Sequence, residues 1–271
     1  MCEIFCFNSN KPKEVNECLK CFYKHSEEHP HGWGLANMHE DAFEITKEPV
    51  KASCSEHLKS ILANPVIGNN IFAHIRLATI GEIISPNCHP FTKIDDNNRS
   101  WVLIHNGTIF DYPQLDEYKE IENGDTDSER ILLYLIDNIN KFESKKGYKS
   151  NPFERFSLLK HLIEDLSFNN KLNLMIFDGE VMYIHSNMKN SLYYLKNEEG
   201  ILIASTPVTD DKNWKPVEIN KLFCLHDGEI LLESKEHSNE YVQTEEQLQY
   251  INKFIESLGE KDGETNKGQI I

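Results

Sequence analysis

The segment KLNLMIFDGEVMYIH (Lys171–His185) decides how this chain is expected to fold. It contains two short runs rich in Ile, Leu, Met, Phe and Tyr, and the pair Asp178-Gly179 lies between them. An Asp-Gly pair between two such runs predicts a β-hairpin with a type I′ turn. The strands of a hairpin are antiparallel, so the segment predicts an antiparallel sheet rather than a doubly wound parallel one.

The same pattern recurs along most of the chain. Short runs rich in Ile, Val, Phe and Tyr, bounded by Gly, Asn, Asp and Pro, predict a succession of strands. The predicted strands are Glu3–Phe7, Gly32–Met38, Phe43–Thr46, Ile71–Arg76, Trp101–His105, Lys171–Phe177, Val181–His185, Leu192–Leu195, Ile201–Ala204, Leu222–Leu225 and Glu229–Leu232. Asn197–Gly200 and Asp227-Gly228 are further turn signals between neighbouring strands.

Five segments predict helices, and the third is the clearest. Between Ser128 and Asn140, apolar residues recur at intervals of three and four, as on a helix that packs against a sheet. Residues 125–128 (DTDS) are suitable cap or first-turn residues. The predicted helices are Glu14–Glu28, Ser55–Ala63, Ser128–Asn140, Pro152–Leu166 and Thr244–Leu258, and the predicted loops are Pro65–Asn70, Asp95–Arg99 and Phe142–Asn151.

These elements together predict an α+β fold. Helices stacked on two antiparallel sheets make a four-layer αββα sandwich. We expect residues 2–258 to form a single domain. The segment that follows, residues 259–271, is rich in Gly, Lys and Glu, so we expect a disordered tail.

Charge and composition exclude several classes of partner. The chain has 28 Lys and Arg against 44 Asp and Glu, a net charge of −16, and no basic block, so we expect neither a nucleic acid nor an anionic membrane as partner. No run approaches the roughly 20 apolar residues of a membrane span, and no secretory signal is recognised. The seven cysteines are scattered and odd in number, which favours a reducing, cytoplasmic location over a disulfide framework.

Four segments next to predicted strand ends carry candidate functional groups. They are HGWGLA (His31–Ala36), FAHIRLATIG (Phe72–Gly81), LIHNGTI (Leu103–Ile109) and GDTDSE (Gly124–Glu129). Each has an ordinary structural interpretation: Asn106-Gly107 is a common tight-turn pair, and Asp127 is a common helix-capping residue. Together with Cys2, however, they supply the groups needed to hold a γ-glutamyl substrate and break its side-chain amide.

The order of these motifs resembles that of a known family. The set MCEIF, HGWGLA, HIRLAT, NCHPF (Asn87–Phe91), IHNGTI and GDTDSE resembles the class II glutamine amidotransferases of the N-terminal-nucleophile (Ntn) hydrolase superfamily, closest to its stand-alone branch. The matched motifs run from Cys2 to about Arg130. The resemblance implies the αββα fold of Ntn hydrolases, a small-molecule substrate (glutamine or a γ-glutamyl amide), and neither a metal nor an organic cofactor.

The resemblance also implies which residues carry the chemistry. Removal of Met1 would give Cys2 a free α-amine, which has a pKa of roughly 8 and can activate the residue's own thiol. The Asn106 side-chain amide and the Gly107 backbone N–H would form the oxyanion hole. Glycine would suit position 107 because the chain is expected to turn sharply there.

Substrate binding follows from the same resemblance. Arg76 would hold the α-carboxylate in bidentate fashion, Asp127 would pair with the α-ammonium, and Thr79 would line the glutamate pocket. Two positions depart from the family pattern, because Ile80 replaces a polar residue and His31 replaces an acidic one. Both departures concern the leaving-group preference.

Three other interpretations stay open. Cys18 and Cys21, followed by His25, His29 and His31, have zinc-like spacing, although the two cysteines fall on a predicted helix where they would pack as small apolar residues. The fold could instead serve as a non-catalytic glutamine-binding regulator. The chain could also be a glutaminase subunit that delivers ammonia to a separate synthase, so a protein partner or a homo-oligomer stays open.

Overall fold

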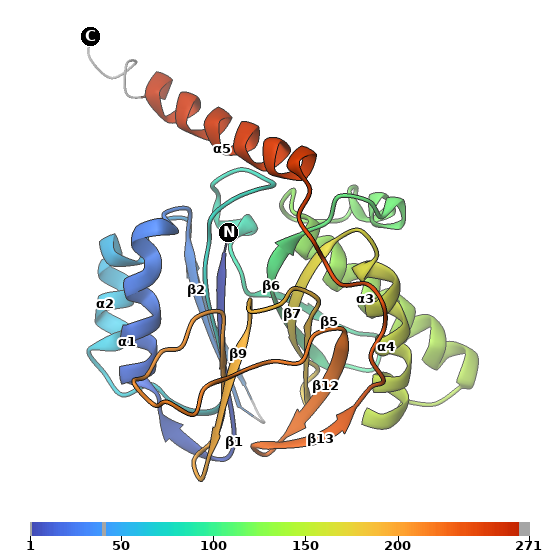
Figure 1. The fold of residues 1–271 in the computed structure, drawn as a ribbon. Helices are drawn as coiled ribbons and strands as arrows, with labels where there is room; N and C mark the ends of the chain where they lie inside the picture. Colours follow the sequence, from blue (N-terminus) through green and yellow to red (C-terminus); the bar gives the residue numbers. More distant parts are fainter. Residues whose placement is uncertain (1, 40–41, 266–271) are drawn as a thin grey trace.

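The structure, a computed structural model, describes residues 2–39 and 42–265, with side chains described as far as Leu258. Two sheets lie face to face, and helices cover both outer faces (Figure 1). Every strand pairing described is antiparallel. The predicted α+β fold, a four-layer αββα sandwich, is therefore confirmed.

The first sheet has seven strands, in the spatial order β11 (Lys215–Pro216), β9 (Tyr193–Asn197), β10 (Gly200–Ala204), β1 (Glu3–Glu14), β4 (Ile67–Ile75), β2 (Trp33–Met38) and β3 (Phe43–Glu48). The second has six, in the order β13 (Glu229–Glu233), β12 (Lys221–His226), β8 (Met182–Ser186), β7 (Lys171–Phe177), β6 (Ser100–Thr108) and β5 (Phe91–Ile94). The helices are α1 (Asn16–Lys24), α2 (Glu56–Leu62), α3 (Asp127–Lys146), α4 (Pro152–Ser167) and α5 (Glu245–Thr265), and short 3-10 turns cover His25–Glu28, Ala52–Cys54, Ser85–Asn87 and Pro113–Tyr118.

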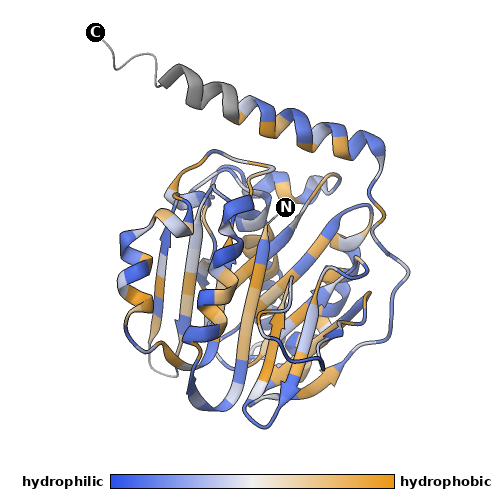
Figure 2. Cartoon of the chain, turned by 60° about the vertical axis from the view of Figure 1, so that its left-hand side comes forward, coloured by the Kyte–Doolittle hydropathy of each residue, from blue (hydrophilic) through white to orange (hydrophobic). Residues whose placement is uncertain are grey.

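Three apolar clusters hold the four layers together. One joins α1 and α2 to the seven-stranded sheet, one joins α3 and α4 to the six-stranded sheet, and the third fills the space between the sheets. Side chains alternate between the two faces of a strand, so Phe5 faces the helices while Ile4 faces the opposite sheet. The inner strands are accordingly largely apolar, whereas the outer helices mix polar and apolar residues (Figure 2).

The turn of the hairpin at Lys171–His185 is not the predicted type I′ turn. Between β7 and β8 only Gly179 has a positive φ, of 88°, whereas a type I′ turn needs two such residues. Asp178 instead accepts the N–H groups of Glu180 and Val181 through its side chain, at 3.0 and 2.9 Å. The two-residue turn Asp227-Gly228, between β12 and β13, does have two positive φ values, 53° and 76°.

Several predicted boundaries were wrong. The strands β5 and β11 were missed, and β4 begins at Ile67, within the predicted loop Pro65–Asn70. Helix α3 continues to Lys146, into the predicted loop Phe142–Asn151, and ends where Gly147 adopts a left-handed conformation with φ of 77°. Its charged last turns lack the apolar stripe but still favour a helix.

Helix α5 also runs further than predicted. It lies across the end of the sandwich from which β1 starts (Figure 1). Its helical backbone continues past Leu258 to Thr265, so the first part of the predicted disordered tail is helical. Residues 266–271 lie outside the described residues, and the single domain at residues 2–258 stays a prediction.

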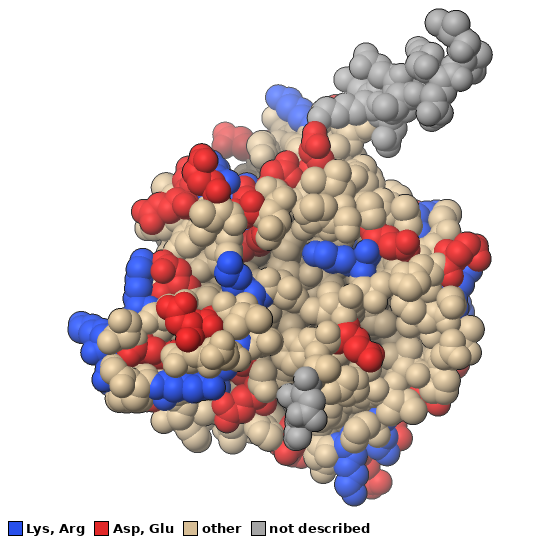
Figure 3. All heavy atoms as spheres, turned by 180° about the vertical axis from the view of Figure 1, so that it is seen from behind, with Lys and Arg blue, Asp and Glu red and all other residues tan. Residues whose placement is uncertain are grey.

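Two features of the structure relate to the expectation that neither a nucleic acid nor a membrane is a partner. On the face shown in Figure 3, Lys and Arg side chains are interspersed with Asp and Glu. Among the described helices, none has both the length and the apolar character that a membrane span needs.

Candidate active site

Strand alternation places Cys2 and Asn106 on facing surfaces of the two sheets. Cys2 precedes β1 and has the parity of Ile4, while Asn106 on β6 has the parity of Ile104, and both isoleucines lie in the cluster between the sheets. One serine joins the two strands: Ser205 Oγ accepts from the Asn106 side-chain amide at 3.3 Å and from the Ile4 backbone N–H at 3.1 Å. Nothing in the sequence motifs pointed to Ser205.

The loop after β4 brings Arg76 beside Cys2. Strands β1 and β4 pair with Glu3 opposite Ile75, and the Cys2 thiol donates to the Leu77 carbonyl at 3.4 Å. Arg76 is only 2% exposed. Its guanidinium donates to the carbonyls of residues 80, 81 and 82, at 2.9, 3.2 and 2.8 Å. In this structure the guanidinium therefore shapes the loop that follows it.

Thr79 fastens the same loop to the end of β6. Its hydroxyl lies 3.1 Å from the hydroxyl of Thr108, which donates to the Gly107 carbonyl at 2.8 Å. The predicted pocket residue therefore contacts the segment that carries the predicted oxyanion hole.

Gly107 does not lie in a turn, which corrects the prediction. It belongs to β6, extended and paired opposite Leu172 on β7. A Cβ at this position would lie 2.0 Å from the Lys171 carbonyl oxygen and 2.2 Å from His105 Nε2. Glycine is required because neighbouring atoms approach its Cα closely, not because of its φ.

Asp127 lies in the first turn of α3 but is not the cap. The N-cap is Thr126, whose hydroxyl accepts the N–H of Glu129 at 3.3 Å. Asp127 Oδ2 accepts the Ile109 backbone N–H at 2.8 Å, which ties the helix to the residues just after β6. The carboxylate is 6% exposed and lines a pocket of about 200 Å³ together with Ile80.

The electrostatics around Cys2 reveal a residue that sequence analysis missed. Burial raises the pKa of the Cys2 thiol, and the positive charges of Arg76 and Lys171 partly oppose that rise. Lys171 is 3% exposed, and burial lowers its pKa to about 8. By parity with Met175, Lys171 belongs to the inner face of β7. The sequence signal for Lys171 was its place on the strand, where it has the same parity as apolar residues that face the opposite sheet.

The zinc-like candidates have other partners. Cys18 and Cys21 pack half-buried against the apolar cluster under α1. His25 pairs with a carboxylate on β1 at 2.8 Å, His29 is bonded to the His25 carbonyl, and His31 Nδ1 accepts a backbone N–H two residues after Arg76 at 2.9 Å. In the part of the chain that the structure describes, no group of three or more His, Cys, Asp or Glu could hold a metal ion.

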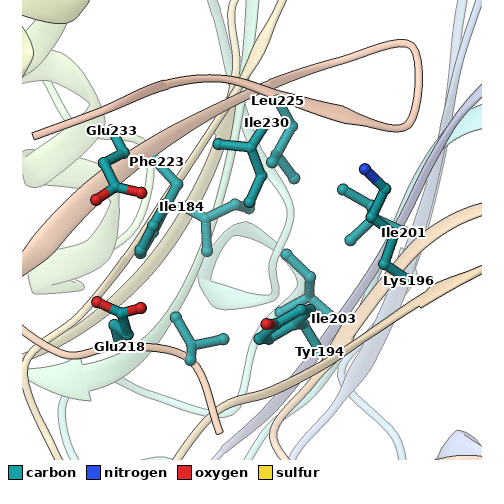
Figure 4. Close-up of a pocket in the computed structure, with 11 residues that line it drawn as sticks. Ile184, Tyr194, Lys196, Ile201, Ile203, Glu218, Phe223, Leu225, Ile230 and Glu233 are labelled. Carbon is teal, nitrogen blue, oxygen red and sulfur yellow. The ribbon is translucent and has the colours of Figure 1, made fainter. Parts of the chain in front are cut away.

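A second pocket lies between the open edges of the two sheets, as Figure 4 shows. Apolar side chains line most of it, including Ile201 and Ile203, and Lys196 and Glu233 lie among its lining. Ile201 pairs with Asn8, six residues from Cys2, which is roughly 20 Å along a strand. None of the described residues that line this pocket is a cysteine, serine or histidine, so the candidate chemistry is at the Cys2 end.

Comparisons with known proteins show which family the chain resembles. The family model described as "Glutamine amidotransferases class-II" matches residues 1–199. An uncharacterized protein of Methanocaldococcus jannaschii is 29% identical over 265 residues, covering 87% of this chain and 72% of that protein. Glutamine–fructose-6-phosphate aminotransferase of Streptococcus pyogenes is 27% identical over 66% of this chain, which spans only 27% of that enzyme.

A solved structure shows the same fold. Glutamine phosphoribosylpyrophosphate amidotransferase from B. subtilis superposes with a TM-score of 0.62 at 17% identity, over 87% of this chain and 49% of that one. At this identity the likeness concerns the fold alone. The predicted sandwich of the Ntn type is confirmed by it.

Proposed function

The chain belongs to the class II glutamine amidotransferases, and from this membership we propose that it hydrolyses the side-chain amide of glutamine or of a γ-glutamyl compound through a thioester on Cys2. The observation that carries the proposal is the convergence of four segments on one end of the two sheets. The starts of β1 and α3 and the ends of β4 and β6 are linked there by the Cys2–Leu77, Thr79–Thr108 and Asp127–Ile109 hydrogen bonds.

The nucleophile needs a base, because burial raises the pKa of its thiol. Removal of Met1 supplies one, the α-amine of Cys2 itself, which takes the thiol proton directly or through a water. The thiolate attacks the side-chain carbonyl carbon of the substrate, and the carbonyl oxygen becomes an oxyanion. The α-amine passes the thiol proton to the leaving nitrogen, and collapse of the intermediate expels ammonia or an amine and leaves the thioester. Water then hydrolyses the thioester to glutamate and the free thiol.

The oxyanion would be held by two N–H donors at the end of β6. The Asn106 side-chain amide lies on the inner face and is held in place by Ser205. The Gly107 backbone follows it, at the only type of residue that fits there. A preorganised donor of this kind typically lowers the barrier by about 3 kcal/mol.

The glutamate end of the substrate would lie between a cation and a carboxylate. Arg76 would exchange part of its carbonyl contacts for the α-carboxylate, and Asp127 would accept from the α-ammonium. The pocket beside Asp127 is lined by Ile80, where the family pattern has a polar residue. Because recognition concerns the free amino-acid end, the leaving group at the other end can vary.

Labelling by an electrophilic glutamine analogue tests the proposal. Protein incubated with a diazo-ketone norleucine and analysed by intact mass and peptide mapping should lack Met1 and carry one adduct, on Cys2. Cys54 is exposed and serves as the internal control for unselective alkylation. An unmodified chain, or an adduct on Cys54 with none on Cys2, would contradict the proposal.

Replacing the guanidinium should mainly weaken substrate binding. Arg76→Lys keeps the charge but loses the forked donor geometry, so KM for glutamine should rise about 10- to 100-fold while kcat falls less. Steady-state kinetics measure the two parameters separately. A large fall in kcat with KM unchanged would show that Arg76 acts on the chemical step instead.

Replacing Lys171, whose side-chain amine is buried, should stabilise the fold and slow the reaction of the Cys2 thiol with an electrophile. The pKa of Lys171 is lowered to about 8 in the folded protein, below its ordinary value near 10.4. Below pH 8 the folded chain therefore buries a charged amine, at a cost of up to about 3 kcal/mol that fades as the pH rises towards 10.4. Lys171→Met should raise Tm at pH 7, gain less at pH 9.5, and slow Cys2 alkylation severalfold.

The matched control for this prediction is Lys93→Met, which changes an exposed lysine on β5. It should alter neither Tm nor the alkylation rate appreciably. A Tm gain for Lys171→Met that is the same at both pH values would show that the gain comes from packing rather than from the charge.

A second candidate function follows from the likeness to part of a longer aminotransferase. The chain matches about a quarter of the Streptococcus pyogenes aminotransferase, so it could supply ammonia to a separate partner. Glutaminase turnover that rises severalfold when a co-purified protein is added back would favour this role. Equal turnover with and without other proteins would favour a stand-alone hydrolase.

A further inference from the structure

Asp127 lies at the end of a buried chain of polar groups that the proposed reaction leaves unexplained. His105 Nδ1 is 3.0 Å from Ser128 Oγ, which in turn is 3.2 Å from Asp127 Oδ1. The three side chains are 1%, 4% and 6% exposed. Among the described residues, Ser128 is the only donor within hydrogen-bond distance of Oδ1, since Ile109 donates to Oδ2.

The second ring nitrogen of His105 fixes where the imidazole proton lies. His105 Nε2 is 3.3 Å from the Lys171 backbone oxygen, which can only accept a hydrogen bond. Nε2 must therefore carry the proton, and in a neutral ring Nδ1 is left as an acceptor. Burial lowers the pKa of His105, which keeps the ring neutral at pH 7.

The Ser128 hydroxyl has one proton and two acceptors within reach. If the proton points at Asp127, His105 Nδ1 stays buried without a donor, which is costly. If it points at His105, Asp127 Oδ1 lacks a protein donor, but this carboxylate lines a pocket where water or a ligand can reach it. The second arrangement satisfies every group.

We infer that His105 and Ser128 are positioning residues that keep Asp127 Oδ1 open for the α-ammonium of the substrate. The imidazole draws the hydroxyl proton of Ser128 away from the carboxylate, so the ammonium meets an acceptor that has no competing donor. The inference rests on the proposed function, because it assigns the purpose of this arrangement to binding a γ-glutamyl substrate.

The tautomer of His105 can be measured without substrate. In protein with ¹⁵N-labelled histidine, long-range ¹H–¹⁵N correlations at pH 7.5 should show a neutral ring protonated at Nε2, assigned by its loss in His105→Leu. A ring protonated at Nδ1, or at both nitrogens, would overturn the inference whether or not the protein hydrolyses glutamine. Lack of hydrolysis by the wild-type protein, in contrast, would contradict the proposed function alone.

A double-mutant cycle tests the purpose of the arrangement. His105→Leu frees the Ser128 hydroxyl to donate to Asp127, so KM should rise about tenfold, the effect of a competing hydrogen bond to a charged group. Adding Ser128→Ala removes that donor and should lower KM at least fivefold in this background, with a smaller effect in the wild-type background. Adding Ser60→Ala, at an exposed serine of α2, should restore nothing.

The cycle separates positioning from a structural role. Loss of packing in His105→Leu would not be repaired by removing a second buried hydroxyl. A KM that stays equally high in His105→Leu with and without Ser128→Ala would therefore overturn the inference. If His105→Leu does not fold, His105→Phe keeps the ring volume while lacking the acceptor, and the same cycle applies.

Discussion

Cys2→Ala protein is expected to hydrolyse neither glutamine nor any γ-glutamyl amide above the uncatalysed rate, while still binding L-glutamate. In the proposed mechanism the thiol is the atom that forms the thioester, and a methyl group in its place leaves the α-amine without a nucleophile on its own residue to activate. The proposed glutamate pocket consists of Arg76, Thr79 and Asp127, whose hydrogen bonds do not involve the thiol. Ammonia release measures the loss of turnover, and calorimetric titration with L-glutamate measures the retained binding.

Two further variants make this result interpretable. Cys54→Ala changes an exposed cysteine and should keep wild-type turnover. Cys2→Ser keeps a hydroxyl beside the amine and should retain at most a small residual rate. Glutaminase activity in Cys2→Ala equal to that of the wild type would end the proposed mechanism.

The facing of Cys2 and Asn106 follows from sequence once the strands are assigned. Alternation along β1 and β6 puts both residues in phase with apolar positions such as Ile4 and Ile104. The hydrogen bond from the Asn106 side-chain amide to Ser205 could not be predicted in this way. Ser205 follows β10, far along the chain, and an isolated serine after a strand carries no signal of its own.

Local turn propensities predict the wrong conformation where long-range strand pairing decides it. Asn106-Gly107 has the composition of a tight turn, but β7 pairs alongside it and keeps it extended. The same propensities succeeded at Asp227-Gly228, where both residues have the positive φ that the turn needs. At Asp178-Gly179 the hairpin was right and its turn type wrong, because the Asp178 side chain binds backbone amides of its own turn.

The end of α3 shows what apolar periodicity leaves out. The stripe stops at Ile139, and the predicted helix stopped with it. The helix continues to Lys146, because its last turns are rich in Lys and Glu and one of them, Glu143, is bound by Arg99 at 2.6 Å. Gly147 was the better stop signal, since a left-handed glycine ends many helices.

Asn106→Ala is expected to lower kcat about 10²- to 10³-fold with little change in KM, the usual cost of one oxyanion-hole donor. The side chain lies on the inner face, held by Ser205, while Arg76 and Asp127, which would hold the glutamate end, keep their contacts. The loss should therefore fall on the step in which negative charge develops on the substrate oxygen. Steady-state kinetics and the rate of Cys2 alkylation by the diazo-ketone report that step independently.

The paired residue on the neighbouring strand provides the matched control. Asn173 lies opposite Asn106 in the β6–β7 register, is fully buried, and donates to Ser191 at 3.0 Å. Asn173→Ala removes a buried amide of the same kind, so it should cost stability without slowing the chemical step to the same degree. Equal falls in kcat for the two variants would mean that Asn106 supports the fold rather than the oxyanion. A fall confined to Asn106→Ala would assign the amide to the reaction.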